Sequence, residues 1–177
     1  MADAGANTIS EIDSNGIAHV IAFIPNDGVR DATPTCIAQG PDGALYVGTL
    51  NLFKNGFGPP IPGTGPGNSD VWRINPDTSE DYLHAAHLWT TGLTTVTSCT
   101  FDRHGNFWAT EMFANDVVRI PFSHPTSISH FGSATDTPLP GGIAVAPHGG
   151  IYVAINSLTF VPGTGAVVKL TVSHGDD

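Results

Sequence analysis

The stretch that decides the fold is Cys36-Ile-Ala-Gln-Gly-Pro-Asp-Gly-Ala-Leu-Tyr-Val-Gly-Thr-Leu50, in which two short apolar runs flank a turn. Gly43 stands where a tight hairpin turn needs a positive φ, and the preceding Asp42 tolerates turn geometry. Short apolar runs bounded by turn residues are typical of β-strands. The stretch therefore predicts a β-hairpin over residues 36–50.

The same hairpin recurs twice further along the chain. The two copies are Cys99-Thr-Phe-Asp-Arg-His-Gly-Asn-Phe-Trp-Ala-Thr-Glu111 and Gly142-Ile-Ala-Val-Ala-Pro-His-Gly-Gly-Ile-Tyr-Val-Ala-Ile-Asn156. Gly105 and Gly149 hold the place of the first turn glycine in these copies. A small structural unit that repeats at intervals of about 40 to 50 residues indicates a repeat architecture.

Each hairpin is accompanied by further strand-like segments that also repeat. A third strand is expected at 7–12, 70–74, 116–120 and 166–170. A fourth, weaker strand is expected at 16–23, 85–90 and 128–131. Four antiparallel strands in a unit of about 40 to 50 residues are the signature of a β-propeller blade.

These repeats predict an all-β chain that forms a single β-propeller domain, or part of one, over residues 1–177. Two complete four-stranded antiparallel blades at 32–94 and 95–135 lie between two partial blades at 4–31 and 136–173. A β-sandwich is the alternative. Propellers usually close with four to eight blades. We therefore expect a short four-blade ring, a homodimer that completes the ring, or a chain that is part of a longer propeller.

Composition and charge exclude several classes of partner. The chain has 6 Lys and Arg against 16 Asp and Glu, and its formal net charge is -10. Such a balance opposes binding to nucleic acid and to an anionic membrane surface. The sequence has no apolar run of about 18 residues, and Met1–Gly5 show no signal-peptide pattern. We expect neither a nucleic-acid nor a membrane partner, and the compartment stays open.

The chain resembles the ScyD/ScyE family, which is named for scytonemin-pigment gene clusters and belongs to the wider NHL- and gluconolactonase-like propellers. The similar segments are residues 3–12, 33–50, the Gly/Pro-rich insertion at 54–68, and residues 70–74, 142–153 and 162–170. The resemblance implies a propeller fold and corresponds to the C-terminal part of the family domain. Family members commonly carry a secretion signal, and the family has no well-established activity.

Polar side chains follow the second strand of each hairpin. Glu111, Asn51 and Asn156 offer the hard oxygen ligands that Ca²⁺ or Mg²⁺ prefers. The resemblance to gluconolactonase-like propellers implies that such carboxylate and amide groups hold a divalent cation. The alternative is that they cap strand ends. The aromatic residues Phe53 and Phe113 lie beside the same loops and could form a platform for an apolar ligand or a sugar, or simply bury the loops.

Other reactive residues give no catalytic motif. The eight histidines lack zinc-ligand spacing, and no Gly-x-Ser-x-Gly elbow is present. Cys36 and Cys99 differ by one residue in their distance from the turn glycine, so their side chains should point to opposite sheet faces. We therefore expect no disulfide between them and predict that both are buried as small hydrophobic residues.

Three functions fit these observations. The leading hypothesis is a non-catalytic scaffold propeller that binds a ligand or partner and completes its ring as a homodimer. The first alternative is a divalent-metal-assisted lactonase or hydrolase with Glu111 as the principal ligand. The second is a carbohydrate-binding, lectin-like propeller. Because no catalytic motif is present, the sequence leaves open whether the protein is an enzyme.

Overall fold

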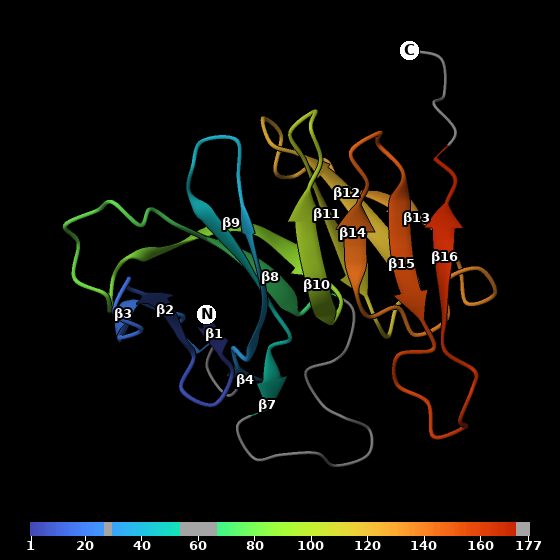
Figure 1. The fold of residues 1–177 in the computed structure, drawn as a ribbon, viewed down its shortest axis with the longest axis horizontal. Helices are drawn as coiled ribbons and strands as arrows, with labels where there is room; N and C mark the ends of the chain where they lie inside the picture. The colour runs from blue at the N-terminus through green and yellow to red at the C-terminus, as the bar shows by residue number, and fades with distance from the viewer. Residues whose placement is uncertain (27–29, 54–66, 173–177) are drawn as a thin grey trace.

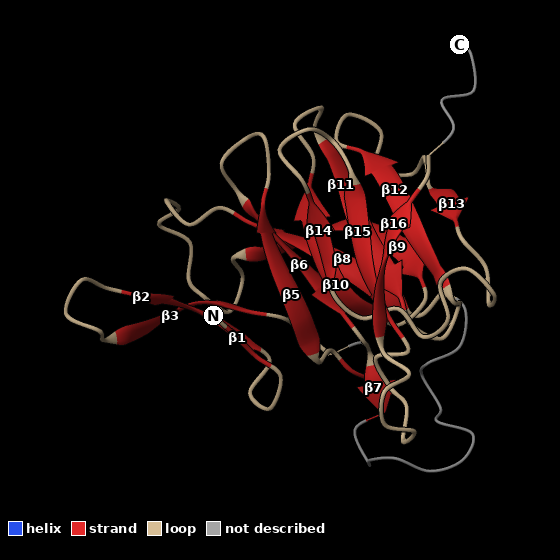
Figure 2. Ribbon diagram, turned by 45° about the vertical axis from the view of Figure 1, so that its right-hand side comes forward, coloured by secondary structure: helices blue, strands red, loops and turns tan. Residues whose placement is uncertain are grey.

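The computed structural model describes residues 1–26, 30–53 and 67–172. The secondary structure of these residues consists of β-strands and contains no helix, so the all-β prediction is confirmed (Figure 2). The structure has no helix among these residues that is long and apolar enough to cross a membrane. Nearly all of the predicted Gly/Pro-rich insertion lies outside the described residues.

The strands form four antiparallel sheets in a row, and a small pair of strands lies beside them (Figure 1). The first sheet contains β1 (Ala2–Asp3), β2 (Thr8–Ile12) and β3 (Ala18–Phe23). The second contains β5 (Pro34–Gln39), β6 (Leu45–Thr49), β8 (Ser69–Ile74) and β9 (Ala86–Leu93). The third contains β10 (Val96–Phe101), β11 (Asn106–Glu111), β12 (Asp116–Pro121) and β13 (Ser129–Phe131). The fourth contains β14 (Ile143–Val145), β15 (Ile151–Ile155) and β16 (Ala166–Leu170). The separate pair is β4 (Arg30–Asp31) with β7 (Leu52–Phe53).

The three repeated hairpins form as the sequence predicts. Their turn glycines, Gly43, Gly105 and Gly149, all have positive φ, between 78° and 88°. A residue with a β-carbon is strained in this region, so glycine is the residue that these turns require. The third strand pairs with the second in every copy, which produces the antiparallel meander of a propeller blade.

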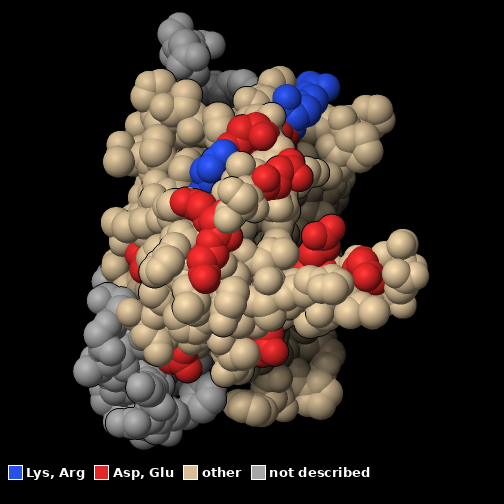
Figure 3. Space-filling view, turned by 90° about the vertical axis from the view of Figure 1, so that its left-hand side faces the viewer, with Lys and Arg blue, Asp and Glu red and all other residues tan. Residues whose placement is uncertain are grey.

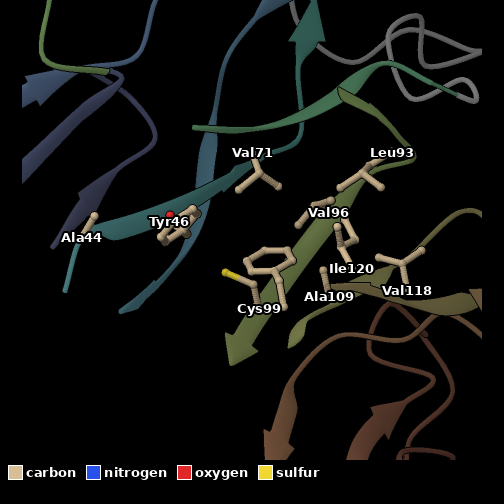
Figure 4. Packing of buried hydrophobic residues seen from close by; sticks show 10 residues of the cluster. Ala44, Tyr46, Val71, Leu93, Val96, Cys99, Ala109, Val118 and Ile120 are labelled. Carbon is tan, nitrogen blue, oxygen red and sulfur yellow. The ribbon is translucent and has the colours of Figure 1, made fainter. Parts of the chain in front are cut away.

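Side chains alternate between the two faces of each sheet, and the core consists of layers between neighbouring sheets. Ile9 and Val47 are buried between the first and second sheets. Tyr46 and Ile120 are buried between the second and third sheets (Figure 4), as is Phe107. Val117 and Val153 help to fill the layer between the third and fourth. The second and third sheets therefore bury apolar side chains on both faces.

The expectation that the two cysteines stay apart is wrong, because Cys36 on β5 and Cys99 on β10 form a disulfide with a Cα–Cα distance of 5.7 Å. The two side chains do point to opposite faces of their own sheets. Successive sheets stack face to face, so the face of the second sheet that points toward the third packs against the opposite face of the third sheet. Opposite faces of neighbouring sheets thus share one layer, and the two sulfur atoms meet there.

A repeated hydrogen bond also links each sheet to the next. In each case a side-chain oxygen lies just before or at the start of β2, β8 or β12, the third strands of the sequence repeat. This oxygen accepts a hydrogen bond from a backbone N–H in the segment that enters the following sheet. The three pairs are Thr33 N to Asn7 Oδ1 (3.0 Å), Val96 N to Ser69 Oγ (3.3 Å) and Leu139 N to Asn115 Oδ1 (3.0 Å). We call these bonds the sheet latches. In the fourth sheet, Gly165 occupies the corresponding place and has no side chain.

The row of sheets is an open arc. The first and last sheets lie at opposite ends of the molecule, and no strand of one pairs with the other among the described residues (Figure 1). A four-blade ring within this part of the chain is therefore not formed. Both end sheets carry exposed apolar side chains: Ile12 (56%) and Val20 (45%) on the first, and Val167 (70%) on the last.

Candidate functional site

The most unusual side chain in the repeated hairpins is Glu111. It ends β11 and is only 1% exposed. At the same distance from the turn glycine, the other two hairpins have Thr49 and Ile155. The propeller fold therefore does not need a carboxyl group at this place. Because burying an ionisable group costs free energy, a buried glutamate of this kind marks a candidate functional site.

Two neighbours form a cluster with this glutamate. Asp116, the first residue of β12, lies directly opposite Glu111 in the strand pairing. His130 on β13 places Nδ1 2.8 Å from Asp116 Oδ2 and 3.5 Å from Glu111 Oε2. The backbone N–H of Thr94, in the turn that enters the third sheet, donates to Glu111 Oε1. We call Glu111, Asp116 and His130 the Glu111 cluster.

The electrostatics of the cluster favour a protonated glutamate. Burial, as the largest cause, and the neighbouring Asp116 together raise the pKa of Glu111 to about 8, against the opposing hydrogen bond from Thr94. Asp116 Oδ1 is buried and has no hydrogen-bond partner among the described residues. The cluster thus combines a carboxyl group that holds a proton near neutral pH, a carboxylate with one unused oxygen, and an imidazole.

The donor set can also hold a cation. One ligand atom from each residue of the Glu111 cluster lies within 4.8 Å of the others. Two carboxyl groups and an imidazole are ligands suited to a divalent metal that displaces the proton of Glu111, and the imidazole favours a transition metal over Ca²⁺. His130 is largely exposed, which gives solvent a path to the cluster. The unused Asp116 oxygen agrees with such a role.

The predicted ligands Asn51 and Asn156 lie elsewhere. Asn51 Nδ2 donates to Asp70 Oδ2 at 2.7 Å, and Asn156 Nδ2 donates to the carbonyl of Thr164 at 2.9 Å. The Asn51 amide therefore binds to the first residues of β8, and the Asn156 amide binds to the loop just before β16. The hydrogen bonds of the three predicted ligands do not join them to one another, and their shared metal site stays a prediction.

The two predicted aromatic residues have different environments. Phe113 lies in the turn between β11 and β12 and is partly buried. Phe53 ends β7, and its side chain is outside the description. The sugar platform stays a prediction.

The sequence did not indicate two members of the Glu111 cluster. Asp116 could have been found by counting the pairing of β11 with β12 outward from Gly105. His130 could not have been found in this way, because its approach depends on the pairing of the short fourth strand β13 with β12.

Comparison with known proteins supports the fold. No protein-family model matches the chain, and no curated protein is similar to it in sequence. Virginiamycin B lyase from Staphylococcus aureus is similar in structure, with a TM-score of 0.63 and 19% identity over 96% of this chain and 50% of that protein. Regucalcin from Agrobacterium tumefaciens, a calcium-binding protein, has a TM-score of 0.58 and 16% identity over 85% of this chain and 48% of its own.

A luciferin-regenerating enzyme has a TM-score of 0.58 and 12% identity over 94% of this chain and 52% of its own. These proteins belong to the broad group of SMP-30-, gluconolactonase- and NHL-like β-propellers, so the predicted fold class is confirmed as a partial propeller. The chain spans about half the length of these structures. At such identities the likeness shows the fold alone, and the narrower resemblance to the ScyD/ScyE family stays a prediction.

Proposed function

We propose that this protein is a non-catalytic scaffold propeller whose first partner is a second copy of the chain. The observation that carries the proposal is the pair of uncovered sheet faces at the two ends of the arc. The second and third sheets bury apolar residues on both faces, whereas the first and fourth do so only toward their inner neighbour. A face that carries exposed Val167 is stabilised when another sheet covers it.

Two arcs related by a two-fold axis would cover both faces at once. The first sheet of each copy would pack on the last sheet of the other, and the closed arrangement would leave no end exposed. The side of the first sheet shows many more acidic than basic side chains (Figure 3), while the last sheet presents Lys169. Opposite charges at the joint favour this head-to-tail pairing.

The mass of the protein in solution tests the scaffold proposal. Size-exclusion chromatography with light scattering should give about twice the 18.4 kDa mass of the chain. Dilution should convert the dimer to monomer with a single dissociation constant. A monomer that persists at high micromolar concentration would contradict the proposal.

A second candidate function is metal-assisted hydrolysis at the Glu111 cluster. The observation that favours it is a glutamate that is 1% exposed and lies beside Asp116, whose buried Oδ1 has no hydrogen-bond partner in the part of the chain that the structure describes. Glu111 and Asp116 would bind the cation, and His130 would complete the ligand set or hold a proton. A divalent cation in such a site would supply an activated water molecule.

Native mass spectrometry with and without EDTA tests this second candidate. The wild-type protein should retain one divalent ion per chain that EDTA removes, and Glu111→Gln should lose it. Glu80→Gln, which changes an exposed glutamate hydrogen-bonded to His87, is the matched control and should keep the ion. Equal metal content in the wild type and Glu111→Gln would exclude the Glu111 cluster as the site.

A further inference from the structure

A small cavity lies between the third and fourth sheets, at the end where the hairpin turns are. Its volume is about 200 Å³. The polar part of its wall comes from both turns and from β12, and includes Arg103, His104, Arg119 and His148. Trp108, Ile151 and Val172 form an apolar wall. The cavity shares no residue with the Glu111 cluster.

The repeat itself shows what is unusual about this cavity. In the second sheet, Tyr46 pairs with Arg73 across the strands, and Arg73 forms an ion pair of 2.8 Å with Asp42, the residue before the turn glycine. In the third sheet, Trp108 pairs with Arg119 in the same register. The residue before that turn glycine is His104. The arginine of the third sheet has therefore lost the carboxylate that its counterpart binds.

Nothing else among the described residues replaces that carboxylate. The Nε of Arg119 is buried and has no hydrogen-bond partner in this part of the chain. The guanidinium lies over the ring of Phe131, 5.6 Å from its centre, and this contact fixes its orientation. Arg103, whose Nε donates to His104, likewise has no ion pair with a carboxylate in the described residues.

Asp102 also lines the cavity but is already saturated. Its Oδ2 accepts bonds from Trp108 Nε1 at 2.8 Å and from the Asn106 side chain at 2.9 Å. The backbone N–H groups of His104 and Asn106 donate to it as well. These four donors stabilise the ionised Asp102 and take up its oxygens within the turn, and no hydrogen bond or ion pair among the residues that the structure describes joins Asp102 to either arginine of the cavity.

We propose that this cavity binds the carboxylate of a small organic acid. Arg119 would donate to a ligand carboxylate as the guanidinium of Arg73 donates to Asp42 Oδ2, and a guanidinium can also match both oxygens of a carboxylate. Arg103 and the two histidines supply further donors. The apolar wall around Trp108 would contact a short hydrocarbon body, and the volume is below that of pockets for drug-sized ligands.

Two features favour this ligand class. A carboxylate fills the equivalent place in the neighbouring sheet, so the arginine geometry is already one that accepts it. The chain has a net charge of -10 and only 6 Lys and Arg residues. Two of these six line one cavity, and neither forms an ion pair with a carboxylate of the described residues. All the residues that form the site belong to one chain, so the site does not depend on dimer formation or on a metal at the Glu111 cluster.

Calorimetric titration with sodium butyrate, at constant ionic strength, tests the proposal. The wild-type protein should bind one butyrate per chain in a saturable way. Arg119→Gln should weaken binding by about ten- to hundredfold, the usual effect of losing hydrogen bonds to a charged group. Arg73→Gln, in which the arginine already has an internal partner, is the matched control and should change the affinity by less than about twofold.

A second variant keeps Arg119 but gives its guanidinium a carboxylate partner within the protein, so that it can no longer bind a ligand. His104→Asp restores the residue found at the corresponding turn position and should give Arg119 an internal carboxylate, so butyrate binding should fall to a similar extent. Butyrate binding that is the same in the wild type, Arg119→Gln and His104→Asp would overturn the proposal. So would the absence of saturable butyrate binding, or saturation by sodium phosphate but not by butyrate.

Discussion

At the scale of single residues, Glu111 is where the sequence departs most from what the fold requires. Its counterparts in the other hairpins are a threonine and an isoleucine, and either would fill the same place without a charge. The folded chain accommodates the glutamate by keeping it protonated beside Asp116. This arrangement makes the stability of the fold depend on pH in a range where ordinary glutamates are already ionised and do not titrate.

The first prediction concerns that window. The pKa of Glu111 is about 8 in the folded protein and 4.5 in the unfolded chain, so between these values only the folded state holds the proton. The free energy of unfolding should therefore decrease as the pH rises from 5 to 8, by up to about 1.4 kcal/mol per pH unit. Glu111→Gln should remove most of this slope.

Urea unfolding at pH 5.5, 6.5 and 7.5 measures how the free energy of unfolding changes with pH. Glu11→Gln, at an exposed position of β2, is the control and should keep the slope of the wild type. A slope that is equal in the wild type and in Glu111→Gln would mean that Glu111 is ionised in the folded protein throughout the range.

At the scale of elements, the sequence was informative where strands are long and turns have specific chemistry. Gly43, Gly105 and Gly149 predicted three hairpins because only glycine suits their backbone conformation. The two-residue strands β1, β4 and β7 gave no signal, since two residues carry no periodicity. For the candidate site, Glu111 was visible as a polar strand end. Its partners depend on pairings across three strands, which a count along one strand does not contain.

The disulfide shows the same limit. Alternation along a strand correctly assigned Cys36 and Cys99 to opposite faces of their own sheets, but the distance between the sulfur atoms is set by how neighbouring sheets stack. Local periodicity carries no information on that stacking. The bond connects β5 to β10 across 63 residues of sequence and joins the two central sheets.

The second prediction follows from this bond. Reduction, or the double substitution Cys36→Ala and Cys99→Ala, should lower the free energy of unfolding by about 2–4 kcal/mol, because the open chain gains conformational freedom when it unfolds. Thermal unfolding with and without dithiothreitol measures the loss. The double variant is its own control, since reductant should leave its midpoint unchanged. A wild-type midpoint that does not respond to complete reduction would contradict the prediction.

At the scale of the whole molecule, the uncovered end sheets are the dominant feature. In β16, Val168 and Leu170 point into the apolar layer between the third and fourth sheets, and Val167 points to solvent. An apolar residue that is 70% exposed on a sheet face buries little surface in the isolated chain and so stabilises its fold only weakly. In a closed pair of arcs it would lie in the joint.

The third prediction is that Val167→Glu weakens the dimer. A glutamate placed in an apolar joint must either lose its hydration or keep the two sheets apart, so the dissociation constant should rise at least about tenfold. Val161→Glu is the control, because Val161 is 61% exposed in the loop between β15 and β16 and lies off the sheet face. Sedimentation equilibrium measures the dissociation constants of both variants. Equal constants would mean that the fourth sheet does not take part in the dimer contact.

The sheet latches have a consequence for how the molecule opens. Each latch connects one sheet only to its successor, as do the apolar layers, so the arc behaves as a one-dimensional array in which every unit is held by its neighbours. The central units have two neighbours and the terminal units have one. Amide protons should therefore exchange with solvent deuterium first at both ends of the arc and last around β6 and β11. Raising the protein concentration should slow exchange in the terminal units alone, as neighbours from a second arc take the missing places.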